Sequence, residues 1–190
     1  MTQIDYFELF DLPRRFSIDQ DALEQKWKSI SSKVHPDRFA SASAVEKRVA
    51  VEWSAHANEA FRVLKEPLKR AEYLCQLAGI DTSERHPGAM DIDFLETQMS
   101  WREALAEADQ SHHVIDLNAL QASVQAASSR YEMQVGELIN HENWQKASDL
   151  IREWMFVQKF AQEVTRAVRS ARDANRQISD VLPFSDSPLS

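Results

Sequence analysis

Residues that favour turns are scarce in this sequence. Its 190 residues include three glycines and six prolines, whereas Ala, Glu, Gln, Leu, Lys and Arg are abundant. A β-rich chain needs glycine-bearing turns at short intervals, and this chain has too few glycines to supply them. Hydrophobic residues make up 43 % of the chain, which is enough for a packed core. We therefore expect an all-α protein.

Charge is distributed unevenly along the chain. Residues 1–78 carry 12 acidic and 12 basic side chains, so the whole formal charge of −8 comes from residues 79–190. A net negative half disfavours nonspecific binding to nucleic acids or membranes and suits protein partners. We expect no nucleic-acid and no membrane partner. The charge difference also indicates two domains, which the chain length allows.

Cysteine content and hydropathy bear on the compartment. Cys75 is the only cysteine, so the chain forms no internal disulfide and no cysteine-based metal cage. The start "MTQIDYFELF" has neither a basic flank nor a long apolar run, and therefore does not resemble a secretory signal. No segment has the ~18 uninterrupted apolar residues of a membrane helix. We expect a cytoplasmic protein.

Hydrophobic side chains in the first 78 residues recur at helical spacing. The opening segment "DYFELF" is short and amphipathic. Longer helices are predicted at residues 19–34, 43–65 and 67–78. The predicted apolar faces of the two long helices consist of Leu23, Trp27, Ile30 and Val34, and of Val45, Val49, Trp53, Ala57, Ala60 and Leu64.

Capping and breaking residues mark the ends of these helices. Ser17 or Asp19 can cap the start of the first long helix. Pro36 ends that helix, because proline lacks an N–H group and clashes with the preceding turn. The closing helix stops at Gly79. The two long helices therefore form an antiparallel hairpin with the sequence "HPD" at its turn.

The remainder of the chain predicts a second group of helices. Residues 79–91 hold two of the three glycines and are interpreted as a linker. Three long helices with short connections imply a small bundle at residues 92–171. The tail at residues 172–190 is polar, contains prolines and is predicted to be disordered. The predicted helices of the bundle are residues 91–109, 116–140 and 144–171.

The tripeptide His35-Pro36-Asp37 lies between two antiparallel amphipathic helices, the first of which is rich in lysine. In this setting the chain resembles a J-domain, the module with which co-chaperones stimulate ATP hydrolysis by DnaK-class chaperones. The phrases "DYFELFDLP", "KVHPDRFAS", "NEAFRVL" and "PLKRAEYL" occur in the order typical of that domain. The phrase "RAEYL" and the acidic bundle after it resemble the HscB branch, the co-chaperones of iron–sulfur cluster assembly. The resemblance spans roughly residues 4–170.

This resemblance implies an architecture and two partners. The protein would be an L-shaped all-α monomer, with a J-domain at residues 1–78 and a scaffold-binding three-helix bundle at residues 92–171. Its partners would be an HscA-type chaperone and an IscU-type iron–sulfur scaffold, which it would bridge. Because the ATPase site belongs to the chaperone, the resemblance implies no catalytic residue, no cofactor and no metal in this chain.

The resemblance also implies roles for the residues of the loop. Asp37 would present the carboxylate that meets an arginine of the chaperone, with His35 beside it. Pro36 would stiffen the backbone, so that little entropy is lost on binding. The expected electrostatic companions are Lys26, Lys28, Lys33 and Arg38. A purely structural interpretation stays open, in which the tripeptide only separates two helices and the lysines form a solvated face.

The helix at residues 91–109 carries a second stripe of side chains beside its core stripe. Leu95, Met99 and Glu103 recur at intervals of four residues, starting one residue after the core position Phe94. Such a second stripe is either a wider buried face or an exposed binding surface.

The last predicted helix adds two aromatic residues, Phe156 and Phe160, beside its apolar seam. The resemblance to HscB implies a scaffold-binding set of Leu95, Met99, Glu103 and Phe156. Two neighbours depart from the pattern of that family. Glu96 stands where an apolar residue is common, and Ser100 stands where an acidic residue is common. These departures bear on the strength and footprint of scaffold binding.

Other function classes fit the sequence less well. The histidines do not form a metal motif, because His112 and His113 point to different helix faces and His141 lacks a second histidine four residues on. No phosphate-binding glycine loop and no convincing nucleophile motif appear, so we do not expect an enzyme.

A helical adaptor that binds partners through its acidic bundle without stimulating an ATPase remains an alternative, in which Asp37 is dispensable. A J-domain protein serving a general chaperone fits less well, because no Gly/Phe-rich or cysteine-rich client module is present.

Overall fold

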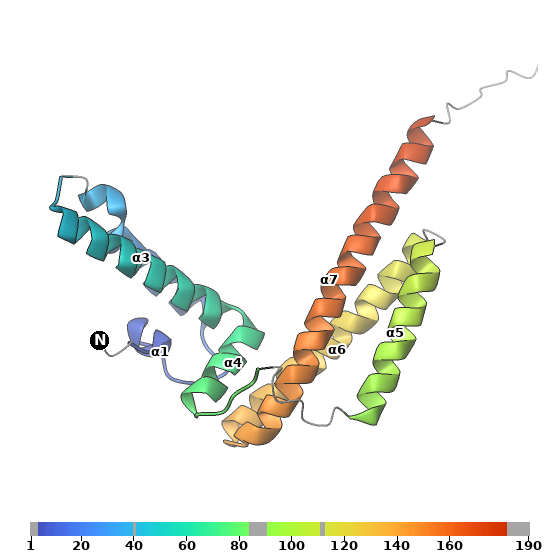
Figure 1. Ribbon diagram of the computed structural model, residues 1–190, viewed down its shortest axis with the longest axis horizontal. Coiled ribbons are helices and arrows are strands. Elements are labelled where there is room, and N and C mark those ends of the chain that lie inside the picture. The colour runs from blue at the N-terminus through green and yellow to red at the C-terminus, as the bar shows by residue number, and fades with distance from the viewer. Residues whose placement is uncertain (1–3, 40, 84–90, 111–112, 182–190) are drawn as a thin grey trace, which may run out of the picture. The chain divides into compact units, whose positions relative to one another are not determined.

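The computed structural model describes residues 4–39, 41–83, 91–110 and 113–181, and no strand occurs among them. The all-α prediction is therefore confirmed. The helical elements are α1 (Tyr6–Leu9), α2 (Gln20–Val34), the 3-10 helix η1 (Pro36–Phe39), α3 (Ala44–Lys65), α4 (Pro67–Leu77), α5 (Ile92–Gln110), α6 (Val114–Asn140) and α7 (Trp144–Val181). They divide into two compact units, Met1–Ser83 with Glu132–Ile151, and Glu84–Tyr131 with Arg152–Ser190 (Figure 1).

Side-chain caps set the starts of the two hairpin helices. Asp19 accepts a hydrogen bond from the amide of Ala22 at 3.0 Å, so it is the cap of α2. Ser43 and Glu46 form a reciprocal capping box at the start of α3. In that box the Glu46 carboxylate accepts from the Ser43 amide at 2.9 Å, and Ser43 Oγ accepts from the Glu46 amide at 3.3 Å. Local sequence therefore determines where both helices begin.

The core of the first unit forms around α3, which packs against α1, α2, η1 and α4. The ring of Trp27 on α2 stacks on Phe61 of α3 with centroids 4.5 Å apart. Its Nε1 also donates to Asn58 Oδ1 at 2.9 Å. Leu23 of α2 is fully buried. These contacts pair α2 and α3 as the predicted hairpin.

The N-terminal part of the predicted apolar face of α3 is exposed. Val45, Val49 and Trp53 are 65 %, 43 % and 38 % exposed, whereas the alanines and the leucine nearer the C-terminal end are fully buried. The physical reason is length, because α2 has 15 residues and α3 has 22. At a rise of about 1.5 Å per residue, α3 extends well beyond its partner. The predicted apolar face of α3 is therefore buried only in its C-terminal part.

A buried arginine links the segment before α2 to α3 and α4. Arg70 is 4 % exposed, and its guanidinium donates to the carbonyl oxygens of Phe16 at 2.6 Å and of Leu64 at 2.5 Å. The guanidinium carbon also lies 5.1 Å from the centroid of the Phe16 ring. Burial lowers the pKa of Arg70, but an arginine starts so high that it stays charged at neutral pH.

The turn between α6 and α7 belongs to the same compact unit as the N-terminal helices. A Cβ atom at Gly136 would lie 2.7 Å from Cδ1 of Phe16, so the close approach of α6 to this ring requires glycine. Ser148 Oγ donates to the carbonyl of Asp81 at 3.3 Å. The predicted division into residues 1–78, linker and bundle stays a prediction. Of the predicted linker, residues 84–90 lie outside the described residues.

In the second unit, α5, α6 and α7 run side by side (Figure 1). Trp154 Nε1 of α7 donates to Ser128 Oγ of α6 at 2.9 Å. The Phe94 ring of α5 meets Tyr131 of α6 edge-on at 6.1 Å. The predicted three-helix bundle therefore forms. Its buried apolar side chains include Leu117, Leu120, Val124, Ala127, Trp154, Val157, Val164 and Val168.

Helix α7 is longer than predicted, because it continues past Ala171 to Val181. Residues 172–181 contain neither glycine nor proline, and several of them are good helix formers. Arg172 also donates to Asn118 Oδ1 of α6 at 3.0 Å, which links this part of α7 to the bundle. The prediction of disorder is wrong for these ten residues. Residues 182–190 of the predicted tail lie outside the described residues.

The buried guanidinium gives a stability prediction. We expect Arg70→Met to lower the free energy of unfolding by about 2–4 kcal/mol, because two buried carbonyl oxygens lose their donor. Thermal and urea unfolding followed by circular dichroism would measure the change. Arg62→Met is the matched control and should change little, since Arg62 is exposed and its ion pair with Glu59 lies on the surface of the same helix. Equal effects of the two substitutions would contradict this assignment.

The thiol of Cys75 gives a pH prediction. Cys75 is fully buried, and burial, with a smaller contribution from Glu72, raises its pKa to about 11. A disulfide reagent such as Ellman's should therefore react slowly with the folded chain at about pH 8 and rapidly once the chain is unfolded. The sign for stability follows from the raised pKa. The contribution of Cys75 to the free energy of unfolding is complete below the pKa of the unfolded thiol, ~8.5. It is lost as pH rises toward 11, the pKa of the folded thiol. Rapid labelling of the folded chain would refute the prediction.

Candidate functional site

The His35-Pro36-Asp37 loop begins where α2 ends. His35 is the C-cap of α2 with an extended backbone (φ −59°, ψ 127°), and η1 follows as a single turn. A residue before proline is disfavoured in the α region, so Pro36 forces the end of α2 at His35. The amide of Arg38 donates to the carbonyl of His35 at 3.0 Å, which closes the turn.

Both polar side chains of the loop face solvent. The side chains of His35 and Asp37 are 58 % and 88 % exposed. His35 Nδ1 accepts a hydrogen bond from the Asp37 amide at 3.3 Å, so the neutral ring carries its proton on Nε2. The same nitrogen lies 3.5 Å from the Asp37 carboxylate. The loop is therefore closed by its own backbone and imidazole, and its carboxylate is presented to solvent.

Lys26 has a structural contact within this chain. Its Nζ donates to both the carbonyl oxygen and the carboxylate of Asp11, at 2.7 Å and 2.8 Å. Asp11 has a φ of 48°, in the left-handed region that side-chain-bearing residues rarely adopt. The hydrogen bond from Lys26 and its charge lower the pKa of the Asp11 carboxyl. Much of the charge of Lys26 is thus compensated, which the spacing of the lysines did not indicate.

The other three predicted basic residues differ in how their charge is balanced. Lys28 pairs with Glu24 one turn earlier at 2.6 Å, and this contact lowers the pKa of Glu24. Lys33 is exposed, and no ion pair joins it to another residue in the described ranges. Arg38 is also exposed, and its Nη1 donates to the carbonyl of Ser32 in the last turn of α2 at 3.1 Å. Lys33 and Arg38 therefore carry the positive charge available to a partner beside the loop.

The second stripe of α5 faces solvent. Leu95 and Met99 are 44 % and 64 % exposed, whereas the preceding core residue Phe94 is 6 % exposed. Glu103 is exposed as well. A wider buried face is therefore excluded for this stripe, and its role in binding stays a prediction. The two residues that depart from the family pattern, Glu96 and Ser100, are also exposed.

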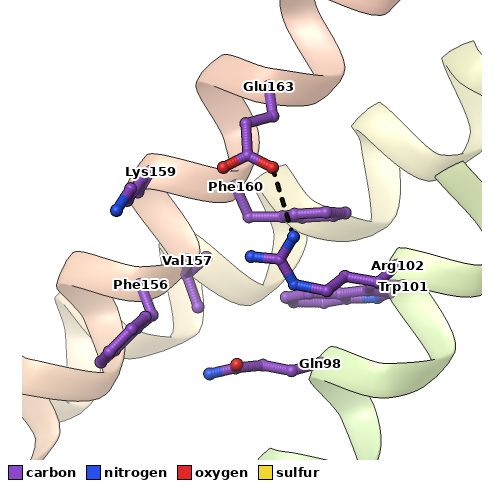
Figure 2. Close-up of a pocket in the computed structure, with 8 residues that line it drawn as sticks. All are labelled: Gln98, Trp101, Arg102, Phe156, Val157, Lys159, Phe160 and Glu163. Atoms are coloured by element: carbon purple, nitrogen blue, oxygen red, sulfur yellow. Dashed lines mark ion pairs between the residues drawn. The ribbon is translucent and has the colours of Figure 1, made fainter.

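The two phenylalanines of α7 have different surroundings. Phe160 is 6 % exposed and belongs to the core, where its ring lies parallel to Trp101 with centroids 5.7 Å apart. Phe156 is partly buried and lines a small groove between α5 and α7 (Figure 2). Of the four predicted scaffold-binding residues, Phe156 is the one that lines this groove.

Sequence reasoning missed the residues of α5 that line the groove. Gln98 and Arg102 lie three and seven residues after Leu95, so helical spacing places them beside the exposed stripe. The sequence spacing alone could therefore have identified these two residues as neighbours of the exposed stripe. Their meeting with Phe156 depends on the packing of α5 against α7, which no local pattern encodes.

The described residues also bear on membrane and metal binding. No helix in the described ranges is long and apolar enough to cross a membrane. In the same residues, no group of three or more His, Cys, Asp and Glu side chains could hold a metal ion. His113 instead pairs with Asp116 in the first turn of α6, with Nδ1 and Oδ2 2.6 Å apart. His112 lies outside the described residues.

Known proteins are similar both to the C-terminal part of this chain and to most of its length. Residues 90–165 match the family model described as the HSCB C-terminal oligomerisation domain. The co-chaperone protein HscB homolog of Bordetella pertussis is 46 % identical over 168 residues, which cover 88 % of this chain and 98 % of that protein. Chaperone HscB from Vibrio cholerae has a TM-score of 0.79 at 35 % identity, over 88 % of this chain and 99 % of that one.

The human co-chaperone protein HscB has a similar fold, with a TM-score of 0.82 at 27 % identity over 87 % of this chain and 82 % of that chain. These likenesses extend over the J-domain-like hairpin as well as the helical bundle. They confirm the resemblance inferred from "HPD" and "RAEYL". Because the identity to the bacterial relatives holds over nearly their whole length, this chain belongs to the HscB family of co-chaperones.

Proposed function

We propose that this chain stimulates the ATPase of an HscA-type chaperone and delivers an IscU-type iron–sulfur scaffold to it. Membership of the HscB family supports a role as a co-chaperone. The single observation that carries the proposal is the loop itself. It presents the almost fully exposed carboxylate of Asp37 from a short closed turn between two packed helices.

The chaperone half of the proposal depends on charge. A preorganised loop loses little conformational entropy on binding, so the free energy of the carboxylate contact is retained. Lys33 and Arg38 add exposed positive charge beside it, which suits an acidic surface on the chaperone. Charges of this kind act mainly on the association rate and on its salt dependence. ATP hydrolysis itself takes place in the chaperone.

The scaffold half of the proposal depends on apolar surface. Leu95 and Met99 are exposed neighbours on α5, and Glu103 continues their stripe. An exposed apolar stripe flanked by polar side chains is typical of a protein-binding surface. A monomer that holds the scaffold while its loop engages the chaperone raises the effective concentration of one partner at the other. On this proposal, this chain and the bound scaffold together stimulate the chaperone ATPase, and neither of them needs a catalytic site of its own.

Substitution of Asp37 distinguishes the proposal from the adaptor alternative, in which Asp37 is dispensable. Asp37→Asn removes the charge and keeps the shape of the side chain, and we expect it to lower chaperone stimulation by at least about tenfold. His35→Gln should act in the same direction. The measurement is single-turnover ATP hydrolysis by an HscA-type chaperone with this chain added. Both residues are more than half exposed, so thermal unfolding should be unchanged.

Asp21→Asn is the matched control for the loop. It removes the same charge from an exposed residue at the other end of α2, and should leave stimulation unchanged. If Asp37→Asn stimulates as well as the wild type, the tripeptide serves only to separate two helices. The adaptor function would then replace the proposal.

The exposed stripe of α5 predicts a separable defect. Leu95→Ala with Phe156→Ala should weaken scaffold binding about 10- to 100-fold, because two apolar contacts are lost. Titration calorimetry with the scaffold would measure it, and stimulation by the chain alone should persist. Phe156 is partly buried, and its truncation can perturb folding. The single variant Leu95→Ala therefore tests the stripe without changing Phe156. Ile115→Ala is the control, since Ile115 is 73 % exposed on α6. Unchanged affinity in the double variant would place the scaffold elsewhere.

A further inference from the structure

Asp11 lies in the turn that ends α1, and the turn forms without its side chain. The amide of Leu12 donates to the carbonyl of Phe7 at 2.9 Å. The amide of Asp11 itself donates to the carbonyl of Glu8 at 3.0 Å. This pair of bonds is a Schellman turn, and Asp11 takes the position whose backbone is left-handed. Glycine is the usual residue at that position, because it has no Cβ atom to cause strain. The Asp11 carboxylate is therefore available for another contact.

That contact joins the turn to α2. Lys26 Nζ donates to the carbonyl oxygen of Asp11 at 2.7 Å and to its carboxylate at 2.8 Å, so two acceptors of one residue hold the ammonium group. The side chains of Asp11 and Lys26 are 97 % and 37 % exposed. An ion pair this exposed contributes little to folding. A partner protein can reach it, so its effect on binding matters more than its effect on stability.

The charge of α2 is balanced far from the loop and unbalanced beside it. Lys28 pairs with Glu24, as Lys26 pairs with Asp11. Lys33, in the last turn of α2, is exposed. Lys33 is seven residues from Lys26, which is about 10 Å along the helix at a rise of ~1.5 Å per residue. That separation is close to the screening length of about 8 Å at physiological salt, so the two lysines act on a partner nearly independently.

An acidic group of a partner would have to compete with Asp11 for Lys26. It would replace an intramolecular ion pair with an intermolecular one, and two hydrogen bonds would be broken first. The released Asp11 carboxylate would then lie beside the acidic group of the partner, and like charges at an interface disfavour binding. Contact at Lys26 therefore gains little, whereas contact at the loop end of α2 gains the charge of Lys33. An internal competitor of this kind discriminates between partners by where their acidic groups lie.

We propose that Asp11 is a specificity-determining residue, which keeps Lys26 out of the docking contact and confines that contact to the loop end of α2. The chaperone surface that fits has its acidic groups beside the site that receives Asp37, not along the whole length of α2. This inference rests on the proposed stimulation of an HscA-type chaperone. It differs from the family resemblance in excluding Lys26 from the contact, and it adds a role for a residue of the turn after α1.

Asp11→Asn tests the inference, because asparagine tolerates the left-handed backbone and carries no charge. We expect the association rate of the full chain with an HscA-type chaperone to rise about two- to fivefold at low ionic strength, and to fall more steeply with salt. Asp21→Asn is the matched control, since it removes the same charge from an exposed residue of α2 and should raise the rate less. Asp11→Gly, which suits the turn, should act like Asp11→Asn and guards against a folding defect specific to asparagine.

Lys26→Met separates release of the lysine from a general change in charge. In that background Asp11→Asn and Asp21→Asn should change the association rate equally, because no ammonium group remains to be released. Equal effects of the two substitutions with Lys26 present would overturn the inference. A lower melting temperature of Asp11→Asn and Asp11→Gly with an unchanged rate would assign the pair to structure alone and also overturn it. In both cases the proposed function stands, provided that the wild-type chain stimulates ATP hydrolysis. If the wild type gives no stimulation, the proposed function fails and this inference fails with it.

Discussion

The pairing of α2 with α3 is the contact on which the first unit depends. Trp27 stacks on Phe61 and donates to Asn58, so one side chain provides both apolar contact and a directional hydrogen bond between the helices. The pairing aligns α2 with α3, and the loop follows directly after α2. Arg70 then links the preceding segment to the same helices through two backbone carbonyls. The position of the loop is thus set by packing several turns away.

The second unit separates its core from its outer surface. Side chains of α6 and α7 are joined by buried and partly buried hydrogen bonds, such as Trp154 and Gln158 to Ser128. Helix α5 is held by aromatic contacts and by the Arg102–Glu163 pair, which is solvent-accessible and adds little stability. Because these contacts use one side of α5, its other side is available to a partner without cost to the fold.

The two proposed sites use different physical interactions. The loop acts through an exposed carboxylate and neighbouring positive charge, which affect how fast a partner is found and in which orientation it binds. The exposed stripe of α5 acts through apolar contact, which mainly affects how long a complex lasts. A co-chaperone that holds one partner while engaging another briefly is served by this combination. The compensated charge of Lys26 shows that nearby lysines on one helix need not share one role.

Sequence alone determined the helical class, most helix starts and the position of the loop, because caps, prolines and apolar periodicity act over a few residues. It also identified the family and the second stripe at Leu95, although only the structure showed that this stripe is exposed. Tertiary structure decided how far the apolar face of α3 is covered, since that depends on the length of α2. It also decided that Lys26 meets Asp11 and that Gln98 and Phe156 line one groove. These contacts join segments far apart in the chain, and only the packing of helices brings such segments together.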